Sequence, residues 1–149
     1  MRVTPRSESA CHLLTGKNSF QINNLGTAVI TGPYSGLGRV FADRLAKRGY
    51  DLLLIACRGD LLEDIAKKLG ALYGVTVKTL TADLSKPADL QAIADRLSAD
   101  ASITMLVNSA GVSTLSPVAG ITPVDAANMI AVNIGAVAAM IAVLPDFKA

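Results

Sequence analysis

Residues 31–38 read Thr31-Gly32-Pro33-Tyr34-Ser35-Gly36-Leu37-Gly38, and this stretch decides the fold. The apolar run 27–30 leads into it, and a helical pattern with Phe41 and Leu45 on one face leaves it. Glycines let the backbone turn tightly and approach a phosphate, while the first turn of the following helix offers free N–H groups. Strand, glycine-rich turn and helix in that order favour a dinucleotide-binding loop. The alternative is a strand-to-helix turn that binds no ligand.

Composition limits the classes of protein to consider. With 149 residues, the chain is one domain or part of one, and 51% hydrophobic residues are ample for a core. The net charge of +2 gives no electrostatic footprint for nucleic acid. Cys11 and Cys57 lack the spacing of metal ligands or of a disulfide framework. We therefore expect no metal site, no nucleic-acid partner and a cytoplasmic location.

The N-terminal residues differ in character from the rest. Residues 1–24 are largely polar and lack the apolar core and the cleavage site of a secretory signal. We expect a flexible extension over 1–24 and a partial dinucleotide-binding domain over 25–149.

Strand and helix patterns alternate four times along the chain. Strands are expected at 27–30, 51–57, 75–80 and 103–107, and the second is apolar enough to be buried on both faces. Helices are expected from the glycine loop to Arg48, from about Leu62 to Gly74, from Pro87 with Ser85 as its cap, and from Thr122-Pro123 to about Leu144. The pattern predicts an α/β, Rossmann-like, doubly wound parallel sheet in the order 3-2-1-4, with the ligand beside strands 1 and 4.

The last helix allows a second interpretation. Residues 126–144 form a stretch of 19 residues without a formal charge, which is long enough to span a membrane. Asn128, Asn133 and many alanines instead favour a buried or subunit-interface helix, and we expect no membrane association.

The end of the second strand bears on the cofactor. An NAD site usually has an acidic residue there to hold the ribose hydroxyls, but this chain has Cys57 followed by Arg58. A guanidinium suits a 2′-phosphate, so we expect NADP rather than NAD. The alternative is that Arg58 is an ordinary surface residue.

Four motifs, taken together, resemble the short-chain dehydrogenase/reductase family over residues 26 to about 148. They are the loop 31–38, the pair Asp83-Leu84, the segment Asn108-Ser109-Ala110-Gly111 and the pair Val132-Asn133. The third differs from the family's Asn-Asn-Ala-Gly signature by Ser109. With Arg58 added, the resemblance implies cofactor contacts at Thr31, Gly32, Ser35, Gly36, Leu37, Gly38, Arg58, Asp83, Leu84, Asn108, Ala110 and Gly111. It also implies that Asn133 is the helix asparagine of the family's catalytic tetrad.

The resemblance implies hydride transfer between a nicotinamide and a carbonyl or alcohol. The family's acid/base is the tyrosine of a Tyr-x-x-x-Lys motif, whereas Tyr34, Tyr50 and Tyr73 are not followed by such a lysine. The family's serine would lie on a fifth strand starting near Leu144, so we expect a fold truncated after its fourth β-α unit. The chain alone is then expected to have no turnover, and a small carbonyl or alcohol would be its substrate only with the second half supplied.

Three functions stay open at this stage. The chain is the cofactor-binding half of an NADP-dependent oxidoreductase, a stand-alone nucleotide-binding module, or an interaction protein that pairs through its last helix. An uncovered helix 123–144 predicts homo-oligomers. Pro33 and Tyr34 replace the small residues usual in the family's loop, and either substitution would weaken phosphate binding.

Overall fold

The sheet has four parallel strands in the order β3-β2-β1-β4. The computed structural model describes residues 25–114 and 120–144, so the expected extension 1–24 lies outside the described residues. The strands are β1 (Thr27–Thr31), β2 (Asp51–Ala56), β3 (Val77–Thr81) and β4 (Ile103–Val107). The order confirms the prediction and makes β2 and β1 the inner strands. The interior residues 52–56 of β2 are all buried, as its continuous apolar run predicts.

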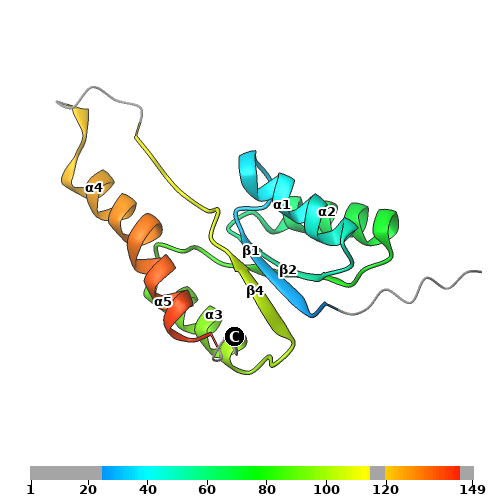
Figure 1. Cartoon of the computed structure of the whole chain (residues 1–149). Coiled ribbons are helices and arrows are strands. Elements are labelled where there is room, and N and C mark those ends of the chain that lie inside the picture. Colours follow the sequence, from blue (N-terminus) through cyan, green and yellow to red (C-terminus); the bar gives the residue numbers. More distant parts are fainter. Residues whose placement is uncertain (1–24, 115–119, 145–149) are drawn as a thin grey trace, which may run out of the picture.

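Helices cover both faces of the sheet (Figure 1). They are α1 (Gly36–Lys47), α2 (Gly59–Tyr73) and α3 (Pro87–Ser98), followed by one long helix made of α4 (Pro123–Ile130), the π-helical segment η2 (Ala131–Gly135) and α5 (Ala136–Ala142). Side chains alternate between the faces along each strand. Ala28 and Ile30 of β1 therefore pack with α1 and α2, while Val29 packs with α3 and the long helix.

One local prediction is wrong, and the last helix contains a feature that was not predicted. Ser85 does not cap α3, because the residue at the N-cap is Lys86 and both the N–H and the hydroxyl of Ser85 donate to Asp83. The last helix is not uniformly α-helical, since Ala136 N–H donates to Ala131 O across five residues. Such a π segment accommodates an extra residue within a helix and is frequent at functional sites.

The long helix remains largely uncovered on its outer side. Pro123–Ala142 is the one helix within the described ranges whose length and mean hydropathy of 1.7 would allow a membrane span. Only 17% of its most apolar window is buried. The expectation of no membrane association stays a prediction.

Candidate functional site

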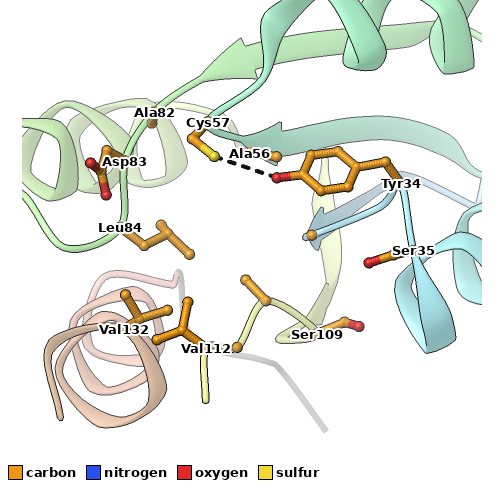
Figure 2. A pocket seen from close by; sticks show the side chains of 13 residues that line it. Tyr34, Ser35, Ala56, Cys57, Ala82, Asp83, Leu84, Ser109, Val112 and Val132 are labelled. Carbon is orange, nitrogen blue, oxygen red and sulfur yellow. Dashed lines mark hydrogen bonds between the residues drawn. The ribbon is translucent and has the colours of Figure 1, made fainter. Parts of the chain in front are cut away.

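A cleft of about 160 Å³ lies at the carboxyl ends of the strands. Figure 2 shows its lining side chains, which come from all four strand ends and from the long helix. The lining residues are Gly32, Tyr34, Ser35, Ala56, Cys57, Ala82, Asp83, Leu84, Ser109, Ala110, Gly111, Val112 and Val132. This is the crevice in which ligands bind to doubly wound sheets, because the helices that follow β1 and β4 lie on opposite faces of the sheet.

The glycine loop packs too closely for side chains at two positions. Gly32 has φ +64°, and a Cβ there would lie 2.9 Å from Ala110 Cα. A Cβ on Gly38 would collide with the carbonyl oxygen of Gly32. Glycine at these positions thus lets the loop contact both the first turn of α1 and the segment after β4.

The N-terminus of α1 faces the cleft with the properties of an anion site. Ser35 occupies the N-cap in an extended conformation, but its side chain makes no capping hydrogen bond. Its hydroxyl therefore stays available to a ligand, and Figure 2 shows Ser35 at the edge of the cleft. No acidic residue lies in the first turn of α1, and nothing approaches within 4 Å of the Cβ position of Gly36. A phosphate would meet the positive end of the helix dipole without repulsion.

The segment after β4 is fixed from two sides. Thr31 Oγ1, in a residue only 1% exposed, accepts hydrogen bonds from Ser109 N–H and Ala110 N–H, both at 3.0 Å. Asn133 Oδ1 accepts from Val112 N–H at 2.9 Å, and Asn133 Nδ2 donates to Val112 O at 2.8 Å. Thr31 and Asn133 therefore hold one wall of the cleft in place, while neither side chain lines it.

Asp83 brings a carboxylate to the cleft after β3. Its Oδ1 accepts from Ser85 Oγ at 2.7 Å and from Ser85 N–H at 3.0 Å. These bonds, the side-chain bond first, hold the pKa of Asp83 below its ordinary value. Lys86 Nζ lies 3.7 Å from Asp83 Oδ2. The carboxylate is thus kept charged and able to accept a hydrogen bond from a ligand.

Tyr34 forms a cluster with the end of β2. Its hydroxyl lies 3.4 Å from Cys57 Sγ, and Figure 2 shows the ring reaching across the cleft toward Cys57. The guanidinium carbon of Arg58 lies over the ring, 4.4 Å from its centroid. The hydrogen bond with Cys57, followed by partial burial, raises the pKa of Tyr34 above its ordinary value. The phenol therefore stays neutral at physiological pH.

The structure brings about half of the predicted cofactor residues to the cleft. Gly32, Ser35, Asp83, Leu84, Ala110 and Gly111 line it. Those predicted to contact the cofactor but absent from the lining are Thr31, Gly36, Leu37, Gly38, Arg58 and Asn108. Arg58 stands at the rim through its contact with Tyr34. Cofactor contact at each position, and catalysis by Asn133, stay predictions.

Sequence reasoning missed several apolar residues of the lining. Leu84 was predicted, but Ala56, Ala82, Val112 and Val132 were not assigned to the site. Ala56 and Ala82 lie at the ends of β2 and β3, so the rule that ligands bind at carboxyl strand ends could have identified them. Val112 and Val132 carry no such signal, because they meet through the packing of the long helix against the segment after β4.

Known proteins resemble this chain in sequence and in fold. The family model described as short chain dehydrogenase matches residues 26–149. Very-long-chain 3-oxoacyl-CoA reductase-A of Danio rerio is 36% identical over 127 residues, which are 82% of this chain and 40% of the relative. A short-chain dehydrogenase from Sphingobium yanoikuyae, solved in complex with NADPH, is 38% identical with a TM-score of 0.78, covering 80% of this chain and 47% of that one. The bulky-bulky ketone specific alcohol dehydrogenase from Comamonas testosteroni is 31% identical with a TM-score of 0.79, covering 81% and 48%.

The matches cover a similar part of each relative. The chain spans less than half the length of these relatives, which matches the expectation that the sequence corresponds to the family's N-terminal, cofactor-binding half. The family model covers the glycine loop, all four strands and the long helix. The chain therefore belongs to the short-chain dehydrogenase family.

Proposed function

We propose that the chain is the NADP(H)-binding half of an oxidoreductase that transfers a hydride between NADP(H) and a carbonyl or alcohol substrate. One observation carries the proposal: a glycine loop and a helix N-terminus line the cleft, and at its rim β2 is followed by Cys57 and Arg58, where an NAD site would have an acid. The NADPH found in the Sphingobium relative supports the same cofactor.

The residues present fit such a cofactor. The N-terminus of α1 and the Ser35 hydroxyl would hold the pyrophosphate, and Arg58 would bind the 2′-phosphate. Leu84 and Val132, 7% and 6% exposed, form an apolar floor that would shield a ring of the cofactor from water. Bound NADP(H) supplies the hydride, and the chain's residues bind and orient it.

Neither Tyr34 nor Tyr73, both among the described residues, is suited to transfer a proton to or from the substrate. The pKa of Tyr34 is raised by its bond with Cys57, and that of Tyr73 by its bond with Asp43. A tyrosine that exchanges protons near neutral pH needs its pKa lowered instead. We expect no dehydrogenase turnover from the 149-residue chain. NADPH oxidation with carbonyl substrates well above background, abolished by Asn133→Ala, would overturn this expectation.

A second candidate function is an association module without catalysis. The exposed apolar side chains of the long helix favour it: Val124, Ile130, Ile134 and Ile141 are 76%, 59%, 63% and 58% exposed. Such a face is typical of a subunit interface. This function predicts co-purification with a partner and no dependence on nucleotide. A cytoplasmic location stays a prediction.

Calorimetric titration of the purified chain with NADPH and with NADH tests the proposal. We expect NADPH to bind more tightly, and Arg58→Ala to weaken NADPH binding about tenfold with little effect on NADH, because a charged hydrogen bond to the 2′-phosphate is lost. Arg48→Ala is the matched control, since it also removes an exposed arginine but at the opposite end of α1. A folded sample that binds neither nucleotide would favour the association module.

A further inference from the structure

Tyr34 separates two hollows on the surface. On one side lies the cleft, and on the other a groove of about 370 Å³ between α1 and α2, which Tyr34 also lines. Arg39 and Lys68 contribute cations to that groove, and Asp43 and Asp64 contribute carboxylates. The aromatic ring therefore stands as a partition between them, at the edge where Arg58 leaves β2.

We propose that Tyr34 determines the preference for NADP(H) over NAD(H), by holding the guanidinium of Arg58 at the rim of the cleft where the 2′-phosphate is received. The inference rests on the proposed function. It assigns to Tyr34 a positioning role that favours cofactor binding, whereas the sequence alone suggested that its bulk would weaken phosphate binding.

The geometry of the stack leaves the guanidinium able to bind phosphate. Arg58 lies over the ring face at 4.4 Å from the centroid, so the ring's π-electrons stabilise the cation. A guanidinium carries five N–H donors in its plane, so donors remain for bidentate contact with a phosphate even though Arg58 also interacts with the Tyr34 hydroxyl. Among the described residues the one ion pair joins Lys86 to Asp83, so no described carboxylate competes for Arg58.

Cys57 completes the arrangement by fixing the ring. The contact between Tyr34 Oη and Cys57 Sγ at 3.4 Å ties the tip of the tyrosine to the residue that precedes Arg58. Since Arg58 is exposed, its side chain would otherwise lose much rotamer freedom on binding. Stacking on Tyr34 restricts the Arg58 side chain before any nucleotide binds, so less rotamer entropy is lost on binding. Arg58 contacts only the 2′-phosphate, so the affinity for NADP(H) rises and that for NAD(H) does not.

The test compares NADPH and NADH affinities, by calorimetry, for Tyr34→Leu and Tyr34→Phe. The leucine variant loses the aromatic face, and we expect its NADPH affinity to fall about two- to fivefold while NADH affinity holds. The phenylalanine variant keeps the aromatic face but loses the hydroxyl contact with Cys57, so it should retain more of the NADPH preference than the leucine variant does. In an Arg58→Ala background, Tyr34→Leu should cause no further loss of NADPH affinity, because the group that it positions is gone.

Control variants separate this role from a general effect on folding. Tyr73→Leu removes a tyrosine that bonds Asp43 outside the cleft, so the ratio of the two affinities should not change. If Tyr34→Leu does not fold by circular dichroism, Tyr34→Ser gives a second non-aromatic variant with the same expected ratio.

Failure of the inference can be told from failure of the proposed function. A wild-type chain that binds neither nucleotide overturns both. A wild-type preference for NADPH that survives in the folded leucine or serine variant, or a preference that rises there, overturns the role of Tyr34 alone.

Discussion

At residue scale, Thr31 shows how a side chain can build a site without lining it. Its hydroxyl accepts two backbone N–H groups from the segment after β4, and the residue is almost fully buried. Ser109 and Ala110 are half-buried, so water would only partly replace these bonds, and loss of the acceptor costs free energy. The threonine of the glycine-loop motif therefore has a structural role, because it holds the segment after β4 that forms one wall of the cleft.

Thr31→Val should lower the free energy of unfolding by about 1–2 kcal/mol, since two half-buried N–H groups lose their acceptor. Urea unfolding measures the loss. Thr79→Val is the matched control on exposed β3 and should change stability by less than about 0.5 kcal/mol. Equal losses in the two variants would contradict the role assigned to Thr31.

The two unusual loop residues show what sequence can and cannot predict at this scale. Pro33 is fully buried and does not line the cleft, while weaker phosphate binding through its missing N–H stays a prediction. Tyr34 does line the cleft, and weaker phosphate binding because of its bulk stays a prediction. The stacking of Tyr34 on Arg58 was not predictable. The two residues follow different strands, β1 and β2, and they meet only because the Tyr34 side chain points toward the end of β2.

At element scale, the long helix begins with a capping box. Thr122 Oγ1 accepts from Asp125 N–H at 3.2 Å, while Thr122 N–H and its hydroxyl donate to Asp125 Oδ2 at 3.0 and 2.7 Å. The predicted cap and the proline at position 123 are confirmed. The helix that carries Asn133 thus starts at a defined residue.

Thr122→Ala should lower the free energy of unfolding by about 1 kcal/mol, as loss of an N-cap does. The bonds from Thr122 hold the pKa of Asp125 below its ordinary value of 3.8. Its contribution is therefore complete above that pH and is lost as the pH falls through the lower, folded-state pKa. Helical circular dichroism between pH 5 and about pH 2 checks the sign. Asp125→Asn should flatten the acid-induced change, and an unchanged profile would contradict the box.

The periodicity of apolar residues predicted the types of the elements well, but it did not predict the local hydrogen bonds at their ends. The strand at 103–107 and the helix end near Arg48 are confirmed because apolar runs and glycine signals are local. The cap of α3 was wrong because Asp83 offered Ser85 a better partner than the helix did. The π segment was not predictable, since a single glycine within a helical pattern, here Gly135, does not specify a π-helical turn.

At the scale of the whole molecule, the sequence predicted the layers and the strand order. With the long helix in an outer layer, one of its sides remains uncovered. Met140 and Ala136 face the sheet, while Ile130 and Ile134, one turn apart, remain exposed. We propose that this exposed side mediates self-association.

The substitution pair Ile130→Lys and Ile134→Lys should shift the chain from oligomer to monomer, because two charges would have to be buried at the interface. Size-exclusion chromatography with light scattering measures the mass. Leu72→Lys is the control, since Leu72 is 68% exposed on α2. A wild-type chain that elutes as a stable monomer would count against the interface.

The distance in sequence across the cleft sets the order in which the site can assemble. Strands β1, β2 and β3 pair with neighbours in the chain, whereas Thr31 meets Ser109 across 78 residues. Closing so long a loop is entropically costly and slow, so docking of β4 should come late in folding. A folding intermediate built from the first three strands would have the glycine loop but no opposite wall. Nucleotide binding would then report completion of the last folding step.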